Sequence, residues 1–169
     1  MRINWFHFPQ SSKPSEKLLQ AIAAFDRVHA KIDSSKFDLN SNAVLAAVSP
    51  ELIRIGFRVE SGKKKSEKIG VPVFYGENGA VEKSFDADAY HEREGIVIEV
   101  EAGRGVVNNQ FLKDLFQACM MDGVSQLCIA VRLTYKGQRD FITVVTFMRT
   151  LFASRRLQLP LKSVVIVGY

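Results

Sequence analysis

Hydrophobic residues recur at intervals of three and four along several stretches of the chain, a spacing that predicts helices with one buried face. We expect four such helices, at residues 15–32, 41–48, 106–121 and 141–157. Ser12 or Ser15 can cap the first helix. The tripeptide Ser-Pro-Glu at 49–51 has the form of a new helix start, with an N-cap residue, a first-turn proline and an early acid. We therefore expect the second helix to end at residue 48 and a separate turn to run through Ile55.

Shorter runs of alternating or continuous apolar residues, bounded by glycine, proline and polar residues, predict strands. We expect extended structure at residues 57–60, 71–75, 80–90, 96–101, 127–133 and 164–167. Pro72 suits an edge strand because it has no N–H to donate, and Asn78-Gly79 predicts a tight hairpin. Three antiparallel strands followed by helix, strand, helix and strand predict an α/β protein whose mixed central sheet is flanked by helices. The length of 169 residues is that of one domain, which we expect to span residues 1–169.

Composition narrows the class of protein. Hydrophobic residues make up 47% of the chain, which is enough to bury a sizeable core. The formal net charge of +5 and the isoelectric point near 9.3 fit a phosphate-rich partner and fit an ordinary basic surface equally well. Cys119 and Cys128 lie in apolar runs without metal-ligand spacing, which predicts two reduced thiols and argues against a zinc site. The start of the chain is too quickly polar for a signal peptide and no apolar run reaches membrane-spanning length, so we expect a cytoplasmic protein without a membrane partner.

Acidic residues interrupt the most apolar of the predicted strands. Glu99 and Glu101 alternate with apolar residues and therefore share one face of the strand with Val97. A turn near residues 91–95 would pair this strand with the preceding one and bring Asp88 level with Glu99. Clustered carboxylates on an apolar strand are costly unless a partner compensates them, and Mg²⁺ is such a partner because it binds carboxylate oxygens. The alternative is that these acids face solvent or pair with lysine and arginine across the sheet.

The spacing of these acids resembles that of a nuclease family. Asp88 is followed eleven positions later by Glu99-Val100-Glu101 and then by Ala102-Gly103-Arg104-Gly105. This pattern resembles the PD-(D/E)xK nuclease superfamily, and within it the restriction-endonuclease branch of the BamHI and BglII type. In that superfamily an Asp ends one strand and an acid-x-Lys triplet lies on the next. Glu101 stands where the lysine is usual, as in BamHI-type sites, and Ala87 stands where the motif has proline. The resemblance extends to the order of elements over about residues 57–133.

The resemblance implies a restriction-endonuclease-like domain that hydrolyses phosphodiester bonds in DNA with Mg²⁺, for which Mn²⁺ can substitute. Asp88, Glu99 and the backbone carbonyl of Val100 would hold the metal, and Glu101 would position the attacking water or hold a second metal. Such an endonuclease would serve restriction or anti-phage defence. The alternative is a catalytically inactive nucleic-acid-binding or regulatory protein that keeps the nuclease fold, because the usual lysine is absent.

Polar residues around the acids are candidate contacts for DNA. Gln110 and Lys113 open the helix that follows the acidic strand. We expect Lys113 to act at the active site and Gln110 to contact DNA; the alternative is a solvated Lys113 on a helix capped by Asn108. Arg104, flanked by glycines, is a candidate for bidentate phosphate binding or a surface turn residue. Lys63, Lys64 and Lys65 can contact the DNA backbone or form a solvated loop.

Two further features bear on chemistry and assembly. His91 lies at the turn beside Asp88 and is a candidate general base, although a histidine in a turn usually has no such role. The polar segment 135–139 is a second candidate phosphate contact. Cutting both strands of a duplex needs two active sites, so we expect a homodimer. Its candidate interfaces are the aromatic run at 5–8 and the C-terminal helix, and either can instead belong to the core.

Overall fold

The computed structural model of the chain describes residues 3–103, 106 and 108–169. Its helices are α1 (Glu16–Ile32), α2 (Ser41–Arg54), α3 (Gln110–Met120) and α4 (Asp140–Ser154). Its strands are β1 (Asn4–Phe8), β2 (Arg58–Val59), β3 (Ile69–Tyr75), β4 (Val81–Ala87), β5 (Ala89–His91), β6 (Ile96–Glu101), β7 (Gln126–Val131) and β8 (Ser163–Gly168). Within this described part, none of the helices combines the length and the apolar composition that a membrane span requires.

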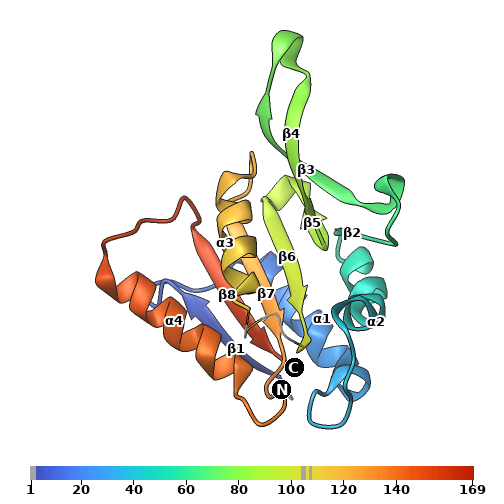
Figure 1. The fold of residues 1–169 in the computed structure, drawn as a ribbon, viewed down its shortest axis with the longest axis vertical. Coiled ribbons are helices and arrows are strands. Elements are labelled where there is room, and N and C mark those ends of the chain that lie inside the picture. Colours follow the sequence, from blue (N-terminus) through green and yellow to red (C-terminus); the bar gives the residue numbers. More distant parts are fainter. Residues whose placement is uncertain (1–2, 104–105, 107) are drawn as a thin grey trace.

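Six strands form one mixed sheet in the order β1-β8-β7-β6-β5-β2 (Figure 1). Strands β6, β7 and β8 are parallel, whereas β1 pairs antiparallel with β8, β5 with β6, and β2 with β5. Parallel neighbours need a crossover connection. Helix α3 lies in the connection from β6 to β7, and helix α4 in that from β7 to β8. The α/β class and the mixed sheet predicted from the sequence are therefore confirmed.

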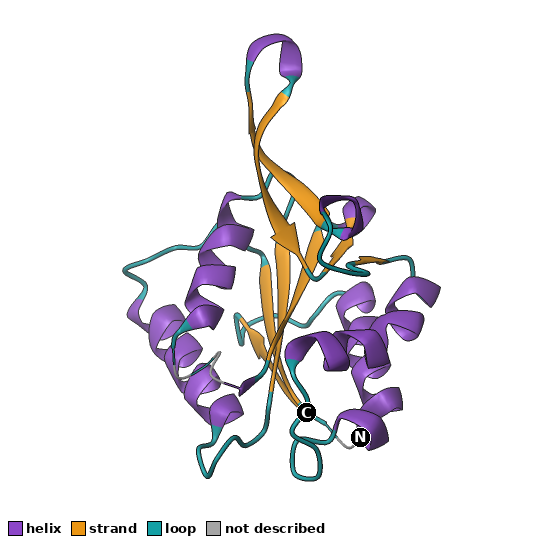
Figure 2. Ribbon diagram, turned by 45° about the vertical axis from the view of Figure 1, so that its right-hand side comes forward, coloured by secondary structure: helices purple, strands orange, loops and turns teal. Residues whose placement is uncertain are grey.

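Helices cover both faces of this sheet, as Figure 2 shows. Helices α1 and α2 pack on one face around a core that contains Phe25. Helices α3 and α4 cover the opposite face around a core that contains Phe111. Strand β6 supplies side chains to both cores in alternation, with Ile98 in the first and Val97 in the second. The side chains of β6 that alternate with Ile98 therefore face α3.

The second helix is longer than the sequence pattern predicts. It begins after Asn40, whose side-chain oxygen caps it, and it runs unbroken through Pro50. The tripeptide at 49–51 does not begin a new helix, because Val48 and Leu52 continue one buried stripe across it. Pro50 itself lies on the exposed face, where water can replace the hydrogen bond that a proline removes. The prediction that the helix ends at residue 48 was wrong.

The aromatic residues at the N-terminus form strand β1, which the sequence pattern did not predict. Strand β1 pairs with β8 from Asn4, opposite Gly168, to Phe8, opposite Val164. Phe8 is 1% exposed, and its ring stacks on that of Phe152 in α4 at 5.3 Å between centroids. Phe8 therefore belongs to the core of its own chain, and the homodimer stays a prediction.

The strand predicted over residues 80–90 is in fact two strands that belong to different sheets. Strand β4 pairs with β3 in a hairpin that projects from the body of the molecule (Figure 1), and the turn at Asn78-Gly79 is confirmed. Strand β5 joins the central sheet. The chain changes sheets at Asp88, whose Oδ2 accepts the N–H of Val100 at 2.8 Å. The Asp88 side chain thus replaces a strand hydrogen bond, which is why a single strand was the wrong prediction.

Two helix boundaries also differ from the predicted ones. Helix α3 begins at Gln110 rather than at residue 106, because Asn109 before it has the left-handed φ of 56°. Helix α4 ends at Ser154 rather than at residue 157, and Arg155 follows it with a left-handed φ of 54°. Left-handed residues interrupt a helix in both places, and hydrophobic spacing alone does not reveal them.

Candidate functional site

The acidic residues singled out in the sequence line one pocket near the C-terminal end of β6. This pocket has a volume of about 290 Å³. Its lining residues are Ser41, Glu60, Lys68, Asp86, Ala87, Asp88, Glu99, Val100, Glu101, Lys113, Asp114 and Gln117. We call it the acid pocket, because six carboxylic acids and only two lysines line it. Its residues come from β6, from α3, from the start of α2, from the end of β4 and from the segments on either side of the projecting hairpin.

The pairing of β5 with β6 sets the position of Asp88. Ala89 lies opposite Ile98, so the next residues along, Asp88 and Glu99, meet where β5 begins. The carboxylate of Asp88 accepts the N–H of Val100 at 2.8 Å. The N–H and C=O groups of one strand residue point to the same side of the strand. The Val100 carbonyl therefore also faces the Asp88 side of β6, and the expectation that Asp88 lies level with Glu99 agrees with the register.

Glu99 and Glu101 project from the face of β6 that α3 covers, the face on which Val97 is buried. Asp114 of α3 reaches the same pocket from the buried stripe of its helix, which also carries Phe111. Asp114 is 6% exposed, and its Oδ2 has no hydrogen-bond partner among the described residues. A buried polar atom without a partner destabilises the fold. The Oδ2 atom of Asp114 can therefore accept a hydrogen bond from, or bind, a group that enters the acid pocket.

Burial raises the pKa of each acid at the centre of the pocket. The pKa of Asp88 is raised to about 6 by burial and by its repulsion from Glu60, although the bond from Val100 acts in the opposite direction. Burial, followed by a hydrogen bond shared with Asp114, raises the pKa of Glu101 to about 8. Burial and the neighbouring carboxylates hold the pKa of Glu99 well above its ordinary value. These acids cannot all be ionised at neutral pH unless a cation compensates them.

Two lysines compensate the acids in part. The Nζ atom of Lys68 lies 2.6 Å from Oε1 of Glu60, and the charge of Lys68 lowers the pKa of Asp88. Lys113 is exposed on α3, and its charge lowers the pKa of Glu101. Because burial still dominates at both acids, the two lysines do not supply the positive charge that the pocket needs.

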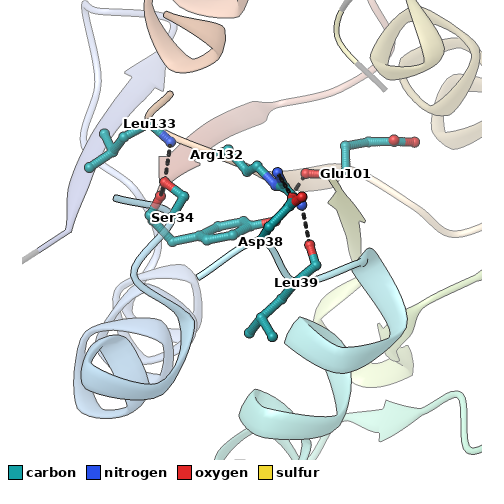
Figure 3. A network of polar contacts seen from close by, with 7 residues as sticks. Ser34, Asp38, Leu39, Glu101, Arg132 and Leu133 are labelled. Atoms are coloured by element: carbon teal, nitrogen blue, oxygen red, sulfur yellow. Dashed lines mark hydrogen bonds and ion pairs between the residues drawn. The ribbon is translucent and has the colours of Figure 1, made fainter. Parts of the chain in front are cut away.

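A network of polar contacts fixes the end of β6 behind the acid pocket (Figure 3). The hydroxyl of Tyr169 donates to the backbone carbonyl of Glu101 at 3.1 Å. The buried Arg132 donates to Asp38 at 2.5 Å and also to the carbonyl of Leu39. Figure 3 shows the side chain of Glu101 turned away from this network. The network therefore holds the backbone of β6 and the segment that leads into α2, and leaves the Glu101 carboxyl to the pocket.

The structure brings together the residues that the sequence predicted for catalysis and metal binding, but not the described residues among those predicted to contact DNA. Those that line the acid pocket are Asp88, Glu99, Val100, Glu101 and Lys113. Gln110 is exposed at the start of α3 and is not part of the pocket wall. Arg104 lies outside the described residues. His91 ends β5 as a buried residue whose Nδ1 accepts the N–H of Glu94 at 3.3 Å, so its position is explained by the turn and not by the pocket.

The three consecutive lysines lie in the loop between β2 and β3, which we call the lysine loop (residues 60–68). Lys64 and Lys65 are exposed, and Lys63 lines a second pocket between this loop and α2. Glu60, at the start of the loop, lines both pockets. The predicted basic surface therefore lies next to the acid pocket. The other predicted phosphate contact, the segment 135–139, contributes to a separate pocket beside Arg132.

Among the residues of the acid pocket that sequence reasoning did not select are the charged residues Glu60, Lys68 and Asp114. Asp114 carries a signal that was available, because it interrupts the apolar stripe of its helix three residues after Phe111. Glu60 and Lys68 carry none, since they reach the pocket only through tertiary contacts. One of these contacts is the hydrogen bond from the N–H of Glu60 to the carbonyl of Asp88 at 2.8 Å.

The donor atoms of the acid pocket fit a hard divalent cation. Mg²⁺ prefers carboxylate and carbonyl oxygens, and it is commonly held by one or two carboxylates with water completing its shell. Asp88, Glu99 and the Val100 carbonyl form such a set, and the unpartnered Oδ2 of Asp114 belongs to the same pocket. In the part of the chain that the structure describes, no three His, Cys, Asp or Glu side chains are arranged to hold a metal ion on their own. A metal here would therefore use the Val100 carbonyl and water besides the carboxylates.

No protein-family model matches the chain, and no curated protein matches it in sequence.

Proposed function

We propose that the protein is a restriction-endonuclease-like, Mg²⁺-dependent endonuclease that hydrolyses phosphodiester bonds in DNA. The observation that carries the proposal is the meeting of Asp88, Glu99 and the Val100 peptide group in a pocket with an excess of carboxylates. These are also the residues on which the sequence resembles the PD-(D/E)xK nucleases. The position of the pocket near the carboxyl end of a parallel strand adds support, because ligands of α/β sheets commonly bind at that edge.

The acids would divide the chemistry between them. Asp88, Glu99 and the Val100 carbonyl would hold the metal, which when bound polarises a phosphoryl oxygen and lowers the pKa of a water ligand. A side-chain hydrogen bond with Asp114 contributes to the raised pKa of Glu101. We infer that Glu101 accepts the proton of the attacking water and that Asp114 keeps its carboxyl oriented.

The lysines would serve the phosphate and the metal ligands in different ways. Lys113 is an exposed residue of the pocket wall, so its ammonium group can contact a phosphate that enters from solvent. Lys68 is held by Glu60 and acts on Asp88 through its charge, which favours the ionised form of that ligand. Neither lysine takes the place in the strand that the superfamily usually gives to its lysine.

The absence of a lysine from the acid-x-Lys position of strand β6 favours a second candidate function. Glu101 stands in the place of the lysine, and with a pKa of about 8 it is largely protonated at neutral pH when no metal is bound. A protein with such a site can bind nucleic acid without cutting it. The alternative is therefore a catalytically inactive nucleic-acid-binding or regulatory protein that keeps the nuclease fold.

Cleavage of supercoiled plasmid separates the two functions. We expect the purified protein to convert the plasmid to nicked or linear DNA when Mg²⁺ or Mn²⁺ is present, and EDTA to abolish the conversion. The reason is that the carboxylates need a cation before they can hold a phosphate and water together. DNA that is bound but stays intact with both metals would favour the inactive protein.

Affinity for DNA is expected to fall steeply as salt is added. Each phosphate contact made by a cation contributes about 0.9 to the slope of log affinity against log salt, because counterions are released on binding. Replacing Lys63, Lys64 and Lys65 with glutamine should therefore reduce the magnitude of this slope by as much as about 2.7. Fluorescence anisotropy with a labelled duplex in EDTA, at several salt concentrations, measures both slopes.

The matched control removes charge elsewhere. Arg155 and Arg156 are exposed cations just beyond α4, whose end lies across the molecule from the lysine loop (Figure 1). Their replacement with glutamine should leave the slope unchanged. If the lysine-loop variant and the wild type have equal slopes, the lysine loop does not contact DNA. If the affinity of the wild type does not change with salt concentration, nucleic acid is not a partner of the protein.

A further inference from the structure

A second and larger pocket lies beside the acid pocket, between α2 and the lysine loop. Its volume is about 520 Å³, and we call it the α2 pocket. Helix α2 gives it an apolar wall formed by Leu45, Ala46 and Pro50. Asn42 adds an amide at the edge of that wall. The pocket therefore offers apolar surface with a few polar groups, which is the usual make-up of a site for a small organic ligand.

The two pockets are direct neighbours. Glu60 lines both of them. At the start of α2, Ser41 lines the acid pocket and the next residue, Asn42, lines the α2 pocket. The α-carbons of consecutive residues are only about 3.8 Å apart, so the two pockets adjoin both at Glu60 and at the start of α2.

The wall of the α2 pocket contains a backbone acceptor that its helix does not use in the ordinary way. The carbonyl of Ala46 would accept the N–H of residue 50 in an uninterrupted helix, but residue 50 is proline and has no N–H. Both residues line the pocket. Together with the amide of Asn42, which can donate and accept, this carbonyl can bind the polar edge of a flat ring.

The opposite wall of the α2 pocket is the lysine loop, whose conformation is held by hydrogen bonds within the loop. The loop closes on Glu67, whose backbone carbonyl accepts the N–H of Ser61 at 3.1 Å and whose Oε2 accepts the N–H of Lys64 at 2.9 Å. Gly62 packs so closely on the Glu67 carboxylate that a Cβ at this position would collide with it. The hydrogen bonds to Glu67 hold the backbone of the loop on both sides of Lys63, whose exposed side chain lines the pocket.

We propose that the α2 pocket binds the base of a nucleotide whose phosphate lies in the acid pocket. The base would stack on the apolar wall, and its edge would meet the Ala46 carbonyl and the Asn42 amide. This inference rests on the proposed function and narrows its substrate. A base can enter such a pocket only after it leaves its stack, so the DNA that is cut is single-stranded or locally unpaired.

Binding of mononucleotides tests the base pocket without any cleavage. Calorimetric titration in Mg²⁺ would compare deoxyadenosine 5′-monophosphate with deoxyribose 5-phosphate, which has the phosphate but no base. We expect the wild type to bind the nucleotide about fivefold to 150-fold more tightly, the range that the stacking of one base contributes. Ala46→Trp, which fills the pocket from an exposed helix position, should remove this preference.

Ile53→Trp is the matched control, because Ile53 is 58% exposed on the same helix and lies outside both pockets. It should keep the preference, with both variants folded as judged by circular dichroism and thermal unfolding. Asn42→Ala leaves the pocket open and should weaken the preference by losing an edge contact. A wild type that binds both ligands equally, or an Ala46→Trp variant that keeps the preference, would overturn the inference.

Cleavage assays on the same preparations distinguish this inference from the function on which it rests. Base preference without cleavage of single-stranded or plasmid DNA supports the α2 pocket and removes the endonuclease proposal. Cleavage without base preference supports the endonuclease and removes the α2 pocket as a base site.

Discussion

Glu99→Gln and Asp88→Asn should each abolish Mg²⁺-dependent cleavage and leave the fold intact. Each replacement removes one of the two carboxylates proposed to hold the metal. Loss of even an outer partner of a metal ligand costs about 10–100-fold in affinity or activity, so a loss of at least about a hundredfold is expected here. Asparagine at position 88 can still accept the N–H of Val100 through its side-chain oxygen, which preserves the local backbone. Plasmid cleavage over a range of Mg²⁺ concentrations measures the effect.

The metal-free variants also separate a catalytic role from a structural one. Replacing one acid of a cluster in which burial and mutual repulsion disfavour ionisation should leave the protein at least as stable as the wild type at neutral pH. Glu77→Gln is the control, because it makes the same chemical change at an exposed position at the tip of the projecting hairpin. Marked destabilisation of metal-free Glu99→Gln, with Glu77→Gln unaffected, would mean that Glu99 holds the fold together instead of a metal.

Local sequence patterns predict well those helices and strands whose buried residues recur with the period of the helix or of the strand itself. Helix α1 follows this rule, since Leu18, Ile22 and Phe25 fall on one stripe. Strand β1 does not, because the partner that makes it a strand is β8, at the other end of the chain. The continuation of α2 through Pro50 likewise depends on packing. The burial of Leu52 stabilises the helix beyond residue 50, and the exposed proline can be accommodated within it.

The candidate site likewise contains residues whose position follows from local sequence patterns and residues whose position depends on tertiary contacts. Alternation along β6 is enough to place Glu99 and Glu101 on one face, and the short turn before β6 is enough to bring Asp88 to them. The change of sheet at Asp88 could not be predicted, because it depends on a side chain replacing a backbone partner. Lys68 could not be predicted either, because its place in the pocket depends on the closure of the lysine loop.

Metal-free protein is expected to be less stable at pH 8 than at pH 5, and Glu101→Gln should remove the part of that difference that Glu101 contributes, while Glu99 and Asp88 keep theirs. Burial raises the pKa of Glu101 from its ordinary 4.5 to about 8, and that of Asp88 from 3.8 to about 6. Between the ordinary and the raised pKa, the folded protein holds protons that the unfolded chain has released. The free energy of unfolding therefore falls as the pH rises through this window. One pKa unit corresponds to about 1.4 kcal/mol, so the total loss is on the order of a few kcal/mol.

Two buried histidines act in the opposite direction. Burial lowers the pKa of His7 and of His91. A histidine whose folded pKa is lowered makes the protein more stable as the pH rises through its titration range, because it is then neutral in both states. The pH profile of the wild type alone therefore mixes two effects. The difference between the wild type and Glu101→Gln isolates the carboxyl effect, since both proteins carry the same histidines.

Urea unfolding in EDTA at pH 5 and at pH 8 gives the required free energies. Glu101→Gln should gain stability relative to the wild type at pH 8 and little at pH 5, whereas Glu77→Gln should follow the wild type at both. Adding Mg²⁺ at pH 8 should stabilise the wild type, because a cation favours the ionised carboxylates that destabilise the metal-free fold. If Glu101→Gln and the wild type keep the same difference in stability at both pH values, the Glu101 carboxyl does not hold its proton in the folded state, and its proposed part in proton transfer loses its basis.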